Sequence, residues 1–272
     1  MKPALKVLSF FFIASLIFTP VLVQAGEAKP AGEATTASEA ATAGEAAEVP
    51  ERDGTYDEPT ARGIVKVRVI VHKQRQRVIT NLLVCDLADP DSNATVAAAG
   101  WHLPGNWTYN LNVKSVPSSV GSANLPTIAS NVFSDWQGAA GGNVSFSRGA
   151  NTTVDRSRYD GRNIIAWGRT SGSTLGVTYI RYFISDGMVV DVDTIMNKRV
   201  PWSWSNSSTC ANSNSYDAEN ILTHEIGHWM GLDDHYDGAY VDNTMFGYGS
   251  KGEVKKNTLT TGDIAGVNAI YP

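Results

Sequence analysis

The sequence predicts an α+β fold. Stretches in which apolar and polar residues alternate recur between residues 64 and 197, and such alternation is typical of strands with one buried face. One early segment, 124–140, and two late segments predict helices. Strands that precede most of the helices are typical of the α+β class.

The chain begins with the features of a secretory signal. Lys2 and Lys6 precede an almost wholly apolar run, 7–18, and small residues lead up to Ala25. We expect residues 1–25 to be removed near Ala25 and the protein to be secreted. The run is too short to span a bilayer comfortably and no second one follows, so we expect no stable membrane span after signal removal.

Residues 26–60 predict an acidic linker rich in Ala, Glu and Thr. The triplet GEA recurs there and large apolar residues are too few to form a core, so we expect disorder. The formal net charge of −5 resides mainly in this segment. The remainder is nearly neutral and has no long basic run, which argues against nucleic acid as the main partner.

Residues 61–98 predict an N-terminal β-hairpin. The stretch IVKVRVIV (64–71) alternates apolar and basic residues, and RVITNLLVCDL (77–87) has the composition of a second strand. Polar residues between the two stretches suit a turn. This segment is either a pro-region or an addition to the main domain, 99–272.

The main domain predicts further strands and its first helix. Strands are expected at 100–117, 143–149, 162–169, 175–184 and 187–197. Segment 124–140 predicts a helix with Pro126 in its first turn. Four apolar residues share one face of that helix: Ile128, Val132, Phe133 and Trp136.

Two helices are expected in the last quarter of the chain. After a polar loop, 201–216, one helix starts near Asp217. The last helix, 259–272, opens with a Thr260–Asp263 capping pair. Its inner face is expected to carry Ile264, Val267 and Ile270.

The candidate metal-binding and catalytic residues are concentrated in one stretch, HEIGHWMGLDDHYD, residues 224–237. His224 and His228 are four residues apart, so on a helix their imidazoles point from one face. Zinc accepts neutral imidazole and, at catalytic sites, takes three protein ligands and a water. Glu225 lies beside the first histidine and is placed to hold that water and take its proton.

A third ligand requires the chain to turn back after the helix. Gly231 accepts the left-handed conformation that ends helices. Three residues later comes Asp234, whose carboxylate is an acceptable zinc ligand. By spacing Asp234 is the third ligand; a one-residue bulge in the turn would favour His235 instead.

These residues resemble the zinc signature of the metzincin metalloproteases, His-Glu-x-x-His-x-x-Gly. The usual third His is replaced here by Asp234, as in the snapalysin variant of the family. Met245, in NTMFGYG, resembles the methionine turn that lies beneath the metal ligands. The stretches VVDVDTIMN and LTTGDIAGVNAIYP resemble the edge strand and last helix of the matrixins. The resemblance runs from about residue 100 to 272.

The resemblance implies a metzincin-like fold: a twisted mixed sheet of about five strands, two long helices and a short C-terminal helix. Peptide or protein substrate would lie along an edge strand within 189–197. The edge residues concerned are Val190, Asp191, Val192 and Asp193. A plain sheet edge guarded by its two acids is the alternative interpretation of this strand.

The resemblance also implies a monomeric secreted zinc endopeptidase with Glu225 as general base. Tyr236 and Tyr248 are candidate donors to the developing oxyanion, by position only. Calcium is common in matrixins, but no EF-hand-like spacing supports it here.

Several alternatives stay open at this stage. Glu253 is the downstream acid that another zincin class would use as third ligand, and a non-catalytic secreted or cell-surface binding protein with a structural zinc is a further function. Cys85 and Cys210 are expected to form a disulfide in an oxidising compartment; the alternative is a Cys85 thiolate that blocks the metal, as in matrixin proenzymes. His72 is expected at the surface.

Overall fold

A computed structural model describes residues 48–75 and 83–272, which all belong to one compact unit, 45–272. The expected signal and most of the expected linker lie outside the described residues. In the described ranges, no helix has the length and apolar character needed to cross a membrane.

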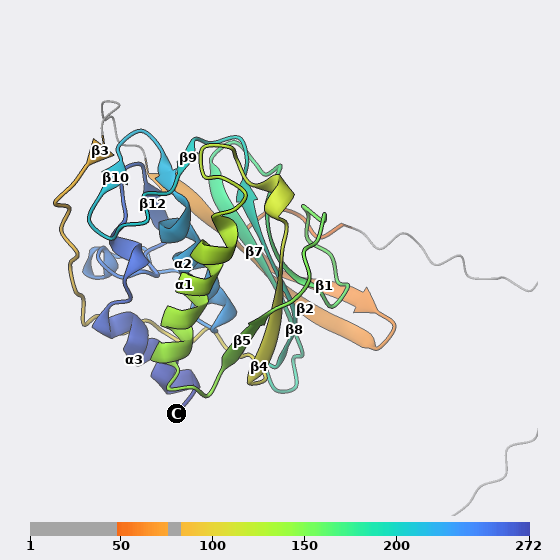
Figure 1. Ribbon diagram of the computed structural model, residues 1–272. Coiled ribbons are helices and arrows are strands. Elements are labelled where there is room, and N and C mark those ends of the chain that lie inside the picture. Colours follow the sequence, from red (N-terminus) through yellow and green to blue (C-terminus); the bar gives the residue numbers. More distant parts are fainter. Residues whose placement is uncertain (1–47, 76–82) are drawn as a thin grey trace, which may run out of the picture. The chain divides into compact units, whose positions relative to one another are not determined.

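The unit is built on one mixed sheet of eight strands (Figure 1). Seven strands follow the order β1 (Gly54–Thr60), β2 (Gly63–Arg75), β7 (Thr174–Tyr182), β8 (Val189–Asn197), β6 (Asn163–Gly168), β4 (Asn106–Leu111) and β5 (Ser145–Arg148). The pairs from β1 to β8 are antiparallel, and the pairs from β8 to β5 are parallel. The eighth strand, β12 (Tyr248–Ser250), pairs with β2 in parallel.

Helices α1 (Leu125–Ala139) and α2 (Ala218–Trp229) lie together on one side of this sheet, with α3 (Thr261–Ile270) near the C-terminus (Figure 1). The main core lies between the sheet and these helices. A smaller apolar cluster involves β2, β6, β7 and β8. The remaining elements are short: η1 (Val113–Ser115), β3 (Leu83–Val84), β9 (Trp202–Ser203), β10 (Ala211–Asn212), β11 (Tyr216–Asp217), η2 (Gly238–Tyr240) and η3 (Lys255–Asn257).

The α+β class is confirmed, as are the mixed sheet, the two long helices and the short C-terminal helix, and the sheet has more strands than the five expected. Helix α1 buries the predicted face, and α3 has the Thr260–Asp263 capping box. Ile264 is 36% exposed, so the inner face of α3 is set by Val267 and not by Ile264. Cys85 and Cys210 form a disulfide between the segments that follow β3 and precede β10.

The N-terminal region differs from expectation, because its strands belong to the main sheet. Residues from Gly54 on, placed in a disordered linker by composition, form β1 and pair with β2 over their whole length. Strand β2 pairs next with β7, whereas Leu83–Val84 pairs with Ala211–Asn212. The predicted hairpin of 64–71 with 77–87 is therefore wrong where the structure describes it.

The predicted substrate edge is also wrong, because β8 lies inside the sheet between β7 and β6. Asp191 and Asp193 do not guard an edge: they are buried, and both accept hydrogen bonds from the guanidinium of Arg181. An alternating pair of acids marks a buried ion-pair site here, because a charge inside the protein needs a partner.

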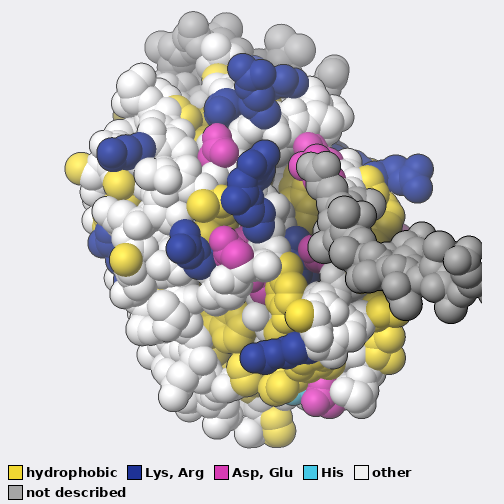
Figure 2. All heavy atoms as spheres, turned by 90° about the vertical axis from the view of Figure 1, so that its right-hand side faces the viewer, with side chains coloured by type: hydrophobic (Ala, Val, Ile, Leu, Met, Phe, Trp, Pro, Cys, Tyr) yellow, Lys and Arg dark blue, Asp and Glu magenta, His cyan; other side chains and the backbone are white. Residues whose placement is uncertain are grey.

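The face turned toward the viewer in Figure 2 carries Lys and Arg side chains in separate groups, with Asp and Glu between them and hydrophobic patches among them. Two basic residues of β2 form ion pairs with nearby acids. Lys66 pairs with Asp57 of β1, and Arg68 pairs with Asp53.

Candidate metal centre

Helix α2 places two histidines side by side in the core. Its first turn is capped by Asp217, whose side chain accepts hydrogen bonds from the backbone N–H groups of Glu219 and Asn220. His224 and His228 have no exposed surface, and their Nε2 atoms lie 3.2 Å apart. The four-residue spacing therefore converges on one point, as expected for the face of a helix.

The other nitrogen of each imidazole is held by a backbone carbonyl. His224 Nδ1 lies 2.7 Å from the carbonyl oxygen of Thr244, and His228 Nδ1 lies 2.9 Å from that of Leu232. A carbonyl only accepts, so both Nδ1 atoms carry the proton and both Nε2 lone pairs face the shared point. Burial lowers the pKa of His224 to about 3, which keeps its ring neutral.

Asp234 reaches the same point from the turn after the helix. Its Oδ1 lies 3.1 Å from His224 Nε2 and 3.6 Å from His228 Nε2, and its carboxylate is only 4% exposed. Burial alone would raise the pKa of Asp234, but the two imidazoles beside it and the hydrogen bond from Tyr236 hold this pKa below its ordinary value.

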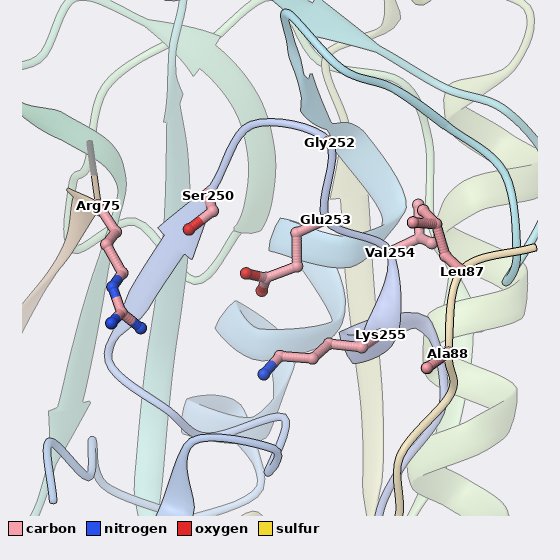
Figure 3. Close-up of a pocket in the computed structure, with 8 residues that line it drawn as sticks. All are labelled: Arg75, Leu87, Ala88, Ser250, Gly252, Glu253, Val254 and Lys255. Atoms are coloured by element: carbon pink, nitrogen blue, oxygen red, sulfur yellow. The ribbon is translucent and has the colours of Figure 1, made fainter. Parts of the chain in front are cut away.

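The alternative ligands lie elsewhere. His235 Nε2 accepts a hydrogen bond from the backbone N–H of Ala97, and its ring stacks on Tyr240. Glu253 lines a cavity of about 510 Å³ beside β12 and points its carboxylate into it (Figure 3). Within the described ranges, neither residue belongs to a group of side chains spaced to hold a metal.

The three ligand atoms fit a zinc ion. Zinc–nitrogen and zinc–oxygen distances of about 2.0–2.2 Å in a tetrahedron require ligand atoms to be roughly 3.3–3.5 Å apart. The three separations found here, 3.1, 3.2 and 3.6 Å, are close to that range. Oδ1 of Asp234 is also buried without a hydrogen-bond partner, and a cation at this point would satisfy it.

Glu225 lies beside this point on the side of the sheet. Its Oε2 accepts a 2.6 Å hydrogen bond from the hydroxyl of Thr178 on β7. A Cβ atom on Gly176 would lie 2.6 Å from Oε1, so glycine at that position lets the carboxylate approach the strand. Burial raises the pKa of Glu225 to about 8, although the hydrogen bond from Thr178 lowers this pKa. The carboxyl group thus lies at one edge of the candidate metal site, where Thr178 fixes its position.

Met245 packs against helix α2 at Gly227. It is fully buried, and its Sδ lies 2.2 Å from where a Cβ on Gly227 would be. Asp263 of α3 holds this turn by accepting hydrogen bonds from the backbone N–H groups of Thr244 and Met245. The same Asp263 completes the capping box of α3, so the last helix and the methionine turn are fixed by one carboxylate.

The two tyrosines proposed as oxyanion donors lie next to each other, with ring centroids 5.1 Å apart. The hydroxyl of Tyr236 donates a 2.9 Å hydrogen bond to Oδ2 of Asp234. Tyr236 therefore orients the carboxylate and leaves Oδ1 without a hydrogen bond, on the side of the two imidazoles. Tyr236 is 42% exposed.

Two residues near Glu225 were missed in the sequence. His72 is not at the surface: it has no exposed area, and its Nδ1 lies 3.3 Å from Oε1 of Glu225. Lys256 is equally buried, and its amine lies 3.4 Å from Nε2 of His72. Burial lowers the pKa of Lys256 to about 8. The one indication in the sequence that His72 is buried is its spacing from Ile70: residues two apart on a strand lie on the same face.

The turn that delivers Asp234 depends on Gly231. This residue has φ +93°, and a Cβ on it would lie 2.4 Å from the carbonyl oxygen of Trp101. We expect Gly231→Ala to lower the free energy of unfolding by about 2–3 kcal/mol, from backbone strain and this clash.

The measurement is urea denaturation in a Glu225→Ala background, which prevents self-digestion. Gly238→Ala is the matched control, because Gly238 has ordinary φ and open space around it. Its expected change is within about 0.5 kcal/mol. Equal stability of the two variants would contradict the role assigned to the turn.

A comparison with protein families agrees with this geometry. The sequence model of the matrixin family matches residues 100–272, more than half of the chain, including α2, Asp234 and Met245. The match begins after β1 and β2. A comparison with individual curated proteins gave no match.

Proposed function

The chain belongs to the matrixin family of zinc metalloproteases, and on this premise we propose that it is a secreted endopeptidase in which residues 99–272 carry out catalysis. His224, His228 and Asp234 hold one zinc ion, and Glu225 is the general base. Secretion follows from the signal features of residues 1–25, with cleavage near Ala25. The substrates are proteins or peptides in extended conformation, and the protein acts as a monomer.

The observation that carries this proposal is the placement of Glu225 beside a three-ligand site. Three protein ligands leave a fourth tetrahedral position for water, as catalytic zinc sites require. A purely structural zinc site has no need of a base, and it commonly has four protein ligands. The buried carboxylate next to the open position therefore favours hydrolysis over the alternative of a binding protein.

The chemistry divides between the metal and the chain. Zinc, when bound, makes water a nucleophile near neutral pH and polarises the scissile carbonyl. Glu225 accepts the proton of the attacking water on its carboxylate and passes it to the departing amine. Thr178 holds that carboxylate through its hydroxyl, and the carbonyls of Thr244 and Leu232 hold the two imidazoles in the binding tautomer.

Zinc removal is the direct test of this function. We expect one zinc per chain by elemental analysis, and loss of both zinc and casein hydrolysis after dialysis against a chelator. Readdition of one equivalent of zinc should restore both, because the three ligands are already in place. The assay is run before and after limited proteolysis of the chain, with Glu225→Ala as the control for contaminating protease.

A zinc-loaded chain that hydrolyses no peptide, even after limited proteolysis has removed its N-terminal strands, would contradict the endopeptidase. That outcome would favour the alternative of a binding protein with a structural zinc. Hydrolysis that persists without zinc would contradict the metal mechanism.

A further inference from the structure

Strand β2 runs directly past the metal centre. It pairs antiparallel with β7 from Lys66 opposite Tyr182 to Lys73 opposite Thr174. On its other side, Lys73 to Arg75 pair in parallel with Tyr248 to Ser250 of β12. Without β2, the backbone groups of β7 and β12 would face an open groove beside Glu225, which β7 contacts through Gly176 and Thr178.

An extended peptide binds such a groove by adding a strand to the exposed sheet edge. The part of the chain that matches the matrixin family starts at residue 100, so β7 and β12 belong to it and β2 does not. Strand β2 therefore lies outside the matched part and pairs with two of its strands. With β2 present, His224, Glu225 and His228 have no exposed surface.

His72 is the side chain that β2 places in the site. Its ring centroid lies 3.9 Å from that of His224, and its Nδ1 faces Oε1 of Glu225 at 3.3 Å. A register shift between His72 and Lys73 occurs at this same point of the β2–β7 pair. The imidazole therefore fills the space beside the base that a substrate side chain would need.

Lys256 lies at the inner end of the space that the His72 ring fills, which we call the His72 pocket. Its amine donates to the carbonyl oxygens of Phe246 and Tyr248, and the remaining donor points toward Nε2 of His72 at 3.4 Å. His224 Nδ1, 3.5 Å away, already donates to Thr244 and cannot accept. The third N–H of the Lys256 amine therefore donates to whichever side chain fills the pocket, which in this structure is His72.

We propose that β2 occupies the peptide-binding groove of this site, so that the chain is latent until β2 leaves, and that Lys256 selects substrates with a hydrogen-bond acceptor in the place of His72. The inference rests on the proposed function, whose groove and pocket it specifies. Histidine, glutamine and glutamate side chains meet the requirement, whereas leucine leaves a buried donor unpaired.

The latency is tested by loosening β2 on the face away from the metal. Val67 and Val69 are fully buried in the smaller apolar cluster, so Val67→Asp with Val69→Asp should release the strand. Ile64→Asp is the matched control, because Ile64 lies on the same strand and is 61% exposed. All three chains are loaded with zinc, and hydrogen exchange of β7 reports whether β2 has left.

The readout is binding of a non-cleavable peptide that carries a zinc-binding hydroxamate, measured in a Glu225→Ala background. We expect the loosened chain to bind about 100-fold more tightly than wild type and Ile64→Asp, because binding needs the form without β2. Equal binding by all three, with β7 exchange increased in the loosened chain, would overturn the groove. Tighter binding without any hydrolysis in the Glu225 form would leave the groove standing and contradict the endopeptidase.

If the double variant does not take up zinc, Arg68→Ala replaces it. This change removes the ion pairs of β2 with Asp53 and with Asp233, next to the metal ligand. The same comparison then applies with a smaller shift in affinity, and an unchanged affinity together with increased β7 exchange overturns the proposal.

The pocket is tested with peptides that differ at the residue taking the place of His72. We expect the loosened chain to prefer His or Gln over Leu by about tenfold, since Leu leaves the Lys256 donor unpaired. Lys256→Met should abolish or reverse this ratio, and Lys255→Met should keep it. A purely structural Lys256 would lower binding of all peptides alike, and that result would overturn the assignment.

Discussion

Replacing Glu225 with alanine is expected to lower the rate of peptide hydrolysis by about 10²–10⁴-fold while zinc stays bound. Glu225 is not one of the three side chains proposed to hold zinc, so its loss should remove the proposed proton acceptor and leave the two imidazoles and Asp234 in place. The expected loss corresponds to about 3–5 kcal/mol of transition-state stabilisation. The measurement pairs kcat/KM on a fluorogenic peptide with the zinc content of each chain, after release of β2.

Glu253→Gln is the control for this experiment. Glu253 lines the cavity of Figure 3, and in the described ranges it joins no metal-binding group. Its substitution should leave zinc content and kcat/KM within about twofold, as expected of a residue outside the site. Loss of zinc from Glu253→Gln would indicate that Glu253 is the third ligand, as in the zincin class that uses a distant glutamate. An active Glu225→Ala variant would refute the role of Glu225 as general base.

The convergence of His224, His228 and Asp234 was predictable because it depends on residues close together in the sequence. The spacing of His224 and His228 on a helix, and a glycine followed three residues later by Asp234, specify convergence within one turn and one loop. The same holds for the Thr260–Asp263 capping box. Each of these depends on residues close in the sequence, where helical periodicity and turn chemistry are reliable.

The sheet order was not predictable by the same means. Period-two alternation shows that a segment is a strand with a buried face, but not which strands lie beside it. Strand β8 was placed at an edge from its resemblance to the matrixin edge strand, although β7 and β6 flank it. The acids that suggested an edge are matched by Arg181 from the neighbouring β7, a contact that only the pairing reveals.

The N-terminal strands show the same limit more strongly. Composition assigned the residues up to 60 to a linker, because few of them are large and apolar. Strand β1 nevertheless forms, since β2 supplies seven consecutive backbone partners for it. His72 and Lys256 are far apart in sequence, so their meeting beside Glu225 depends on the long-range pairing of β2 with β7 and β12.

Replacing Asp234 with alanine is expected to weaken zinc binding by at least about 100-fold, more than the loss of an outer partner costs. Two imidazoles alone leave the ion without the charged ligand that faces both Nε2 atoms. His235→Ala is the neighbouring control, and its zinc affinity should stay the same, because that ring stacks on Tyr240 and accepts from Ala97. Competition with a chromophoric chelator measures both variants. Loss of zinc from His235→Ala, with Asp234→Ala unaffected, would mean that the turn after Gly231 contains a one-residue bulge and that His235 is the third ligand.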